Sequence, residues 1–324
     1  MVEEYVREQR AWLGQLYPKH GDRFVVSPTE RVLDPQSPQW HIVQILQDLL
    51  ESGIGGEEAA QRLADVILPS KDTETLYNNL WGCFFNAVES FSDVQTLTTL
   101  SDLLASLASP PNAVNDEVIE QETIQTDHLT MATSLGHKQF GHKQFGHKQF
   151  GHKQHPWHDL SLLSINITER MQGPETYLCY NEPPKLAARK WKNMNAFLAI
   201  LIRDHATISP TLFGGRIWHA FDTLAMALEH PPKSRLGSNM ILHLPAACAW
   251  ICLARDTVCA AVEVGQEGGY WTASAGQLWR DRDGTNVVDE RRWAFWKWRL
   301  EDVRKDSRID SELADMLLQA SKLM

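Results

Sequence analysis

Apolar residues recur along most of the chain at intervals of three and four, which is the spacing of one face of an α-helix. The clearest run lies in residues 42–50, where five apolar side chains fall at i, i+3, i+4, i+7 and i+8. Gly53 follows this run, as glycine commonly follows a helix, and residues 56–67 then begin with two acids and carry their own apolar face. The pattern predicts a helical hairpin.

Similar amphipathic spacing predicts helices along the rest of the chain, and no convincing run alternates as a strand would. A fixed long repeat of the kind found in solenoids is absent. The sequence therefore predicts an all-α protein of about ten helices, either a multi-helix bundle or an irregular helical array. The further helices are expected at residues 2–17, 73–88 (with Asp72 as a cap), 94–107, 159–171, 186–205, 212–229, 245–264, 291–303 and 309–320.

The composition changes over residues 109–159, where an acidic stretch is followed by three tandem copies of GHKQF and a fourth, partial copy. A glycine in every fifth position suits neither a helix nor a strand, so we predict a long disordered insertion. The prediction for the domains is an N-terminal helical part, 1–108, and a C-terminal helical part, 160–324, that together form one continuous domain.

The net charge, the apolar stretches and the cysteines indicate which partners and which cellular compartment to expect. A formal net charge of −10 argues against nucleic acid as a partner. The N-terminus lacks the apolar core of a signal peptide, and the most apolar stretch, Leu242–Val264, is broken by Arg255 and Asp256, so we expect no membrane span. Five cysteines at irregular spacing suit a reducing compartment. We expect a cytoplasmic protein, with the nucleus also open.

The histidine-rich tract is the first candidate for metal chemistry. Imidazoles spaced five residues apart can collect transition metals weakly, as a purification tag does. A selected metal site is the less favoured interpretation, and we expect no cofactor. The candidate ligands are His137, His142, His147, His152, His155 and His158.

Two further motifs resemble metal sites but lack essential features. Cys248, Cys252 and Cys259 are predicted to share a helix face, but without a C-x-x-C pair they are better interpreted as core residues. Residues 279–290 match part of a calcium-binding loop, yet Trp279 stands where the first carboxylate belongs. We predict a polar turn in which Asp289 or a neighbour caps the following helix.

Catalytic signatures are weak. The sequence contains no P-loop, G-x-S-x-G, G-x-G-x-x-G or H-E-x-x-H. Histidines do lie near carboxylates on predicted helices, so an enzyme or small-ligand binder with a pocket between helices remains the alternative function. The pocket candidates are His205, Trp218, His219 and Asp222.

Aromatic residues and arginines gather near the C-terminus, and both are favoured at the centres of protein interfaces. The favoured hypothesis is therefore a non-catalytic interaction or scaffold module that binds a protein partner or a second copy of itself. The open alternative is that neighbouring helices bury both faces of the aromatic helix. The interface candidates are Trp279, Arg280, Trp293, Trp296 and Trp298.

Two stretches, WHIVQILQDLLESGIGGEEAAQRLADVI and RRWAFWKWRLEDV, resemble an ascomycete fungal family known as domain of unknown function 3632. The resemblance covers most of the chain outside the histidine-rich tract. It implies an all-helical fold shared with the family and an intracellular protein. It implies no catalytic or binding residue.

Overall fold

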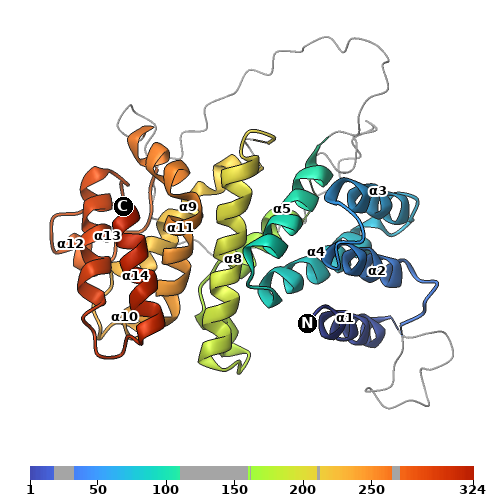
Figure 1. The fold of residues 1–324 in the computed structure, drawn as a ribbon, viewed down its shortest axis with the longest axis horizontal. Helices are drawn as coiled ribbons and strands as arrows, with labels where there is room; N and C mark the ends of the chain where they lie inside the picture. The colour runs from blue at the N-terminus through green and yellow to red at the C-terminus, as the bar shows by residue number, and fades with distance from the viewer. Residues whose placement is uncertain (18–32, 110–159, 161, 210–211, 265–270) are drawn as a thin grey trace, which may run out of the picture. The chain divides into compact units, whose positions relative to one another are not determined.

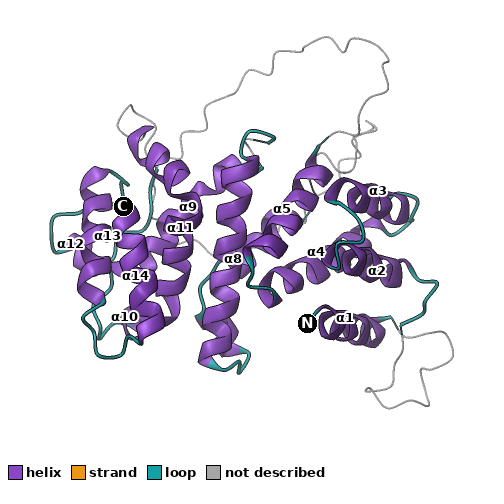
Figure 2. Cartoon of the chain, in the orientation of Figure 1, coloured by secondary structure: helices purple, strands orange, loops and turns teal. Residues whose placement is uncertain are grey.

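The computed structural model describes residues 1–17, 33–109, 160, 162–209, 212–264 and 271–324 (Figure 1). These residues form helices joined by loops and contain no strand, apart from an isolated antiparallel bridge between Thr272 and Val287 (Figure 2). The predicted all-α class is confirmed. The predicted insertion and all six histidines of the tract lie outside the described residues.

Most of the predicted helices begin and end close to their expected bounds, but three short helices, Glu175–Cys179, Arg235–Ser238 and Gln277–Arg280, were not predicted. Aspartates at 72, 93, 289 and 310 cap four of them by accepting a hydrogen bond from a backbone N–H in the first turn, so the predicted caps Asp72 and Asp289 are confirmed. The helices are α1 Val2–Leu16, α2 Pro38–Leu50, α3 Gly56–Ile67, α4 Thr73–Ser90, α5 Val94–Ala108, α6 Leu163–Arg170, α7 Glu175–Cys179, α8 Pro184–His205, α9 Trp218–Leu228, α10 Arg235–Ser238, α11 Met240–Val264, α12 Gln277–Arg280, α13 Glu290–Val303 and α14 Ser311–Leu323.

Helix α8 is the centre of the packing, and the described residues belong to one compact unit. Helices α4 and α5 pack against α8, and so does α11. Helix α11 in turn contacts α9 and α14, and α14 contacts α13. Most helices therefore pack on others that are near them in chain order, from α1 to α14 (Figure 1).

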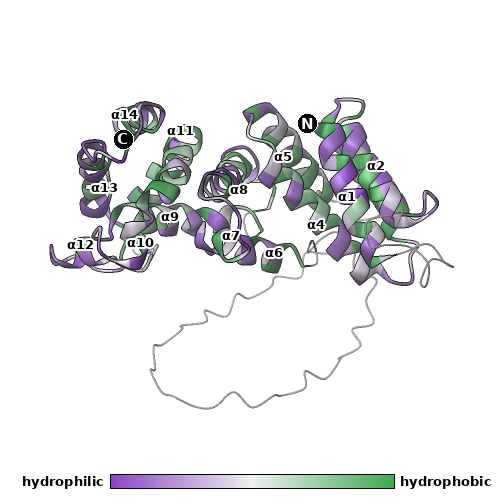
Figure 3. Cartoon of the chain, turned by 90° about the horizontal axis from the view of Figure 1, so that it is seen from below, coloured by the Kyte–Doolittle hydropathy of each residue, from purple (hydrophilic) through white to green (hydrophobic). Residues whose placement is uncertain are grey.

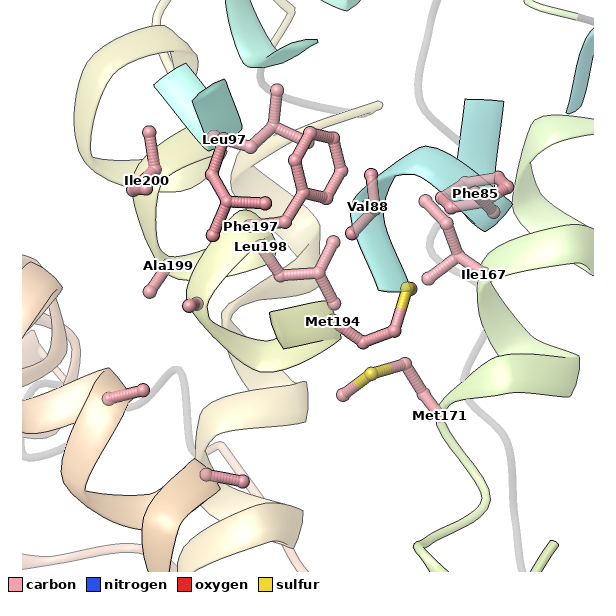
Figure 4. Packing of buried hydrophobic residues seen from close by; sticks show 14 of the residues in the cluster. Phe85, Val88, Leu97, Ile167, Met171, Met194, Phe197, Leu198, Ala199 and Ile200 are labelled. Atoms are coloured by element: carbon pink, nitrogen blue, oxygen red, sulfur yellow. The ribbon is translucent and has the colours of Figure 1, made fainter. Parts of the chain in front are cut away.

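The interior is apolar and rich in aromatic rings, and the outward helix faces carry the polar residues (Figure 3). The side chain of Phe197 in α8 is fully buried. Its ring centroid lies 5.6 Å from that of Phe84 and 6.4 Å from that of Phe85. Both pairs meet edge to face, the geometry that the ring quadrupole favours. Figure 4 shows Phe197 and Phe85 among other buried apolar side chains of this core.

Two predicted helices differ from the observed ones. The helix expected at 212–229 starts as a 3-10 turn, Gly214–Ile217, and becomes an α-helix only at Trp218. Two consecutive glycines account for the late start, because glycine loses the most conformational freedom in a helix. Helix α11 begins at Met240, five residues before Pro245, and is kinked at Ala254, where φ is −136°.

The three cysteines of α11 differ from one another in burial. Cys248 is buried as predicted, but Cys252 is exposed and Cys259 only half-buried, so the core interpretation was wrong for Cys252. Four residues along a helix advance the side chain by about 40° beyond a full turn, which carries Cys252 to the edge of the covered face. The kink at Ala254 then shifts the phase again before Cys259.

Among the described helices, one stretch, Met240–Glu263 of α11, is long and apolar enough to cross a membrane by length and composition. Half of its most apolar window is buried inside the protein. Core helices of water-soluble proteins pass the same test, so the finding is weak evidence for a span.

Candidate functional site

The interface candidates separate into buried and exposed residues. Trp279 and Trp296 are buried, and Trp293 is half-buried. Arg280 is exposed, and Trp298 keeps 42% of its surface accessible. In this structure only Arg280 and Trp298 of the five are therefore freely available to a partner.

Trp298 is part of a cluster of aromatic rings and arginines at α12 and α13, which we name the α13 aromatic face: Trp279, Arg282, Arg291, Phe295 and Trp298. The ring of Phe295 lies 5.2 Å from Trp279 and 5.7 Å from Trp298. The guanidinium of Arg282 lies 4.3 Å from the Trp298 ring and 5.4 Å from the Phe295 ring. Arg291 lies 5.7 Å from the Trp279 ring. Cations at these distances are attracted to the ring faces.

The turn before α13 is built around Trp279. The indole Nε1 donates to the carbonyl of Thr285 over 2.9 Å, and Gly284 lies against the same ring. A Cβ on Gly284 would come within 2.3 Å of the indole, so only glycine fits there. Asp289 then caps α13 by accepting from the N–H of Arg292, as the polar-turn interpretation predicts.

Metal ligands do not gather in the part of the chain that the structure describes. No group of three or more His, Cys, Asp or Glu side chains stands close enough to hold an ion there. In the turn that resembles a calcium-binding loop, the buried indole of Trp279 occupies the position of the first ligand. The six histidines of the tract lie outside the described residues.

Beneath the face, Arg292 and Glu229 form a fully buried ion pair between α13 and the end of α9. Arg292 donates from Nε and Nη2 to the two carboxylate oxygens of Glu229, over 2.7 and 3.0 Å. Its remaining N–H groups bond the carbonyls of Ala273, Ser274 and Asn286. All five donors of the guanidinium are thus satisfied inside the protein.

Glu229 is satisfied as completely as its partner. Its carboxylate also accepts from the Trp296 indole N–H over 2.6 Å and from the backbone N–H of Gly276 over 2.7 Å. A Cβ on Gly276 would lie 2.5 Å from Glu229, so this close approach requires glycine. The network fixes α13 and the preceding loop on α9. Sequence reasoning missed it because the two charges are 63 residues apart.

The pocket candidates make different contacts. His205, at the end of α8, meets Asp102 of α5 with Nε2 3.0 Å from the carboxylate. Trp218 lies on the ring of His219, with the two centroids 3.6 Å apart. Asp222 is half-buried, and burial raises its pKa while the charge of Arg292 opposes the rise. No hydrogen bond, ion pair or ring contact joins His205 to the other three among the described residues.

His219 predicts a pH-dependent stability. Burial, together with the charge of Arg216, lowers the pKa of this 1%-exposed histidine to about 3. The unfolded chain takes up the proton near pH 6.5, so stability falls as the pH drops below that value. At pH 5 the loss relative to pH 7 is about 2 kcal/mol on this account. Urea unfolding at both pH values should show the loss in the wild type and a smaller one in His219→Gln. Equal losses in the two proteins would contradict the assignment.

A second buried polar cluster, which the sequence did not indicate, draws its residues from α4, α6, α7 and α8. Tyr177 donates to Glu89 over 3.0 Å, and Arg170 and Lys190 approach the same carboxylate at 3.3 and 3.8 Å. Burial raises the pKa of Glu89, while the two cations and the tyrosine hydrogen bond oppose the rise. The cluster joins α4 to three consecutive helices, α6, α7 and α8.

The comparisons with known proteins give a family without an assigned activity. No curated protein and no solved structure matches the chain. A family model described as protein of unknown function (DUF3632) matches residues 81–300, which is more than half of the chain. The match runs from α4 to α13 and includes both buried polar clusters and the α13 aromatic face. The chain therefore belongs to the DUF3632 family of proteins of unknown function.

Proposed function

We propose that this protein is a non-catalytic interaction module that binds a protein partner through the α13 aromatic face. The observation that carries the proposal is Trp298, a large aromatic ring that stays 42% exposed while Arg282 stacks on it. Tryptophan and arginine are the residues that most often dominate binding energy at interfaces. Stacking also holds the arginine in place before a partner arrives, which lowers the entropic cost of binding.

The charges of the face favour a partner segment that is acidic and carries an apolar side chain. Arg282 and Arg291 make no ion pair with any described residue, although both lie on aromatic rings. The neighbouring Asp281 accepts a hydrogen bond from Gln277 instead of pairing with Arg282. A stacked guanidinium keeps its N–H edge free for a carboxylate. The apolar side chain of the partner would cover Trp298.

The buried network supports the same role. A binding surface needs rigid elements beneath it, and the Glu229–Arg292 pair fixes α13 from its inner side. Helices packed in chain order are also the architecture of many protein-binding arrays, an argument from fold-level analogy alone.

The source and compartment complete the proposal. We propose an ascomycete origin on the resemblance of the two quoted stretches, and a cytoplasmic location. The five cysteines are free, which suits a reducing compartment. The favoured partner is another protein, and the alternative partner is a second copy of this chain.

Trp298→Ala tests the proposal. Peptides selected from a random phage-displayed library on the wild-type protein should be rich in Asp and Glu and contain at least one large apolar residue. Loss of an anchor worth 2 kcal/mol or more weakens binding about 30-fold, and we expect this drop for the selected peptides on Trp298→Ala. Fluorescence anisotropy of labelled peptides measures it.

The matched control is Tyr180→Ala, which removes an exposed aromatic ring from another part of the chain. It should leave the affinity unchanged. Selected peptides without acidic enrichment, or peptides that bind Trp298→Ala as tightly as the wild type, would overturn the proposed face.

A further inference from the structure

The short segment around α7 covers polar atoms that lie deep in the protein. It begins at Gly173, where φ is +114°, and ends at Asn181, where φ is +61°. Between these two left-handed turns, Tyr177 bonds Glu89 and Glu175 bonds His243 of α11. The segment is therefore attached to the interior through polar side chains.

Glu175 and His243 form a hydrogen-bonded pair. Nε2 of His243 lies 3.0 Å from a carboxylate oxygen of Glu175, and Asn239 donates to the same oxygen over 3.2 Å. Burial acts to raise the pKa of Glu175, but the interactions with His243 and Asn239 lower it to about 2. Glu175 is then an ionised carboxylate that only accepts, so Nε2 of His243 carries the proton. In the tautomer that carries only this proton, Nδ1 is an acceptor.

Two polar atoms on contacting rings remain without partners. Nδ1 of His243 and Nε1 of Trp191 are buried, and neither has a hydrogen-bond partner among the described residues. Both side chains are fully inaccessible, and their rings meet edge-on with centroids 6.4 Å apart. Buried polar atoms are nearly always paired, so an open ring nitrogen on each of two contacting rings indicates a further bound group.

We propose that His243 and Trp191 form the inner end of a binding site for a small molecule with a hydroxyl group, closed on its outer side by α7. A hydroxyl oxygen accepts from the indole N–H and donates its own proton to Nδ1, so one group satisfies both atoms. The side chain of Glu175 keeps 18% of its surface exposed while His243 has none, which places the approach from solvent on the α7 side. This site is separate from the α13 aromatic face.

The experiment uses the full chain with ¹⁵N-labelled histidine, and His243→Gln identifies the His243 resonance. The probes are 2-butanol, glycerol and glucose, with butanone as the matched control because a ketone accepts a hydrogen bond but donates none. We expect the hydroxyl probes to shift the His243 resonance and butanone to shift it less. Trp191→Phe removes the donor and keeps the ring, and we expect it to weaken binding of the hydroxyl probes about tenfold. Trp298→Ala should bind them as the wild type does.

Several results would overturn the site. One is a His243 resonance that no hydroxyl probe moves, and another is an equal response to butanone and 2-butanol, a comparison that needs no variant. Unchanged affinity in folded Trp191→Phe would exclude the indole as a ligand group. A crystal structure in which an ordered water bridges Nδ1 and Nε1 and persists in saturating probe would assign these atoms to structural water alone.

Discussion

Replacing Arg292 with alanine is expected to lower the free energy of unfolding by about 3–5 kcal/mol. The substitution leaves the carboxylate of Glu229 buried without its counter-charge and removes five hydrogen bonds. It also frees the loop carbonyls of Ala273, Ser274 and Asn286 from their donor. Urea denaturation followed by circular dichroism measures the change.

The neighbouring residue provides the control. Arg291 is exposed and forms no ion pair with the described residues, so Arg291→Ala should change stability by no more than about 0.5 kcal/mol. The double variant Glu229→Leu/Arg292→Met should recover only part of the loss, because it removes the unpaired charge but leaves the loop carbonyls and the N–H groups of Gly276 and Trp296 without partners. If Arg292→Ala matched Arg291→Ala, the pair would not hold α13 as described.

Phe197→Ala is expected to cost a similar amount, about 3–5 kcal/mol, for a different reason. The ring is fully buried on the central helix and packs edge to face with Phe84 and Phe85 of α4, so its removal leaves a cavity. The loss should appear as a lower urea midpoint with the slope of the transition retained.

An exposed aromatic ring supplies the comparison for Phe197. Trp298→Ala removes a larger side chain, but 42% of it is already in water, and the expected loss of stability is within about 1 kcal/mol. Comparable losses in the two variants would show that α8 is not the centre of the core, or that Trp298 is a packing residue rather than a binding one.

The helices could be predicted from the sequence because their signals are local. The apolar spacing of residues 42–50 and the caps Asp72 and Asp289 act within one or two turns, and the structure keeps them. The late start at Trp218 and the kink at Ala254 were missed. Glycines account for the first, and the backbone at Ala254 carries no sequence signal that we can identify.

The buried polar contacts could not be predicted, because each depends on segments brought together only by folding. Glu229 occupies the end of a helix, where an acid is ordinarily solvated, and its partner Arg292 lies 63 residues later. Glu175 and His243 are 68 residues apart. The α13 aromatic face could be predicted only in part. The sequence shows that tryptophans gather near the C-terminus, but only the packing distinguishes exposed Trp298 from buried Trp296.

The proposed role of the α13 aromatic face is tested most directly by mapping where an acidic partner peptide binds. Amide hydrogen exchange, with and without a peptide selected on the wild-type protein, should show new protection in α12, α13 and the loop between them, and none in Trp298→Ala. The competing location is the start of α8, where Lys185, Arg189 and Lys192 also lie on one helix side. Protection confined to Pro184–Lys192, or unchanged protection in Trp298→Ala, would contradict the central claim that the α13 aromatic face is the binding surface.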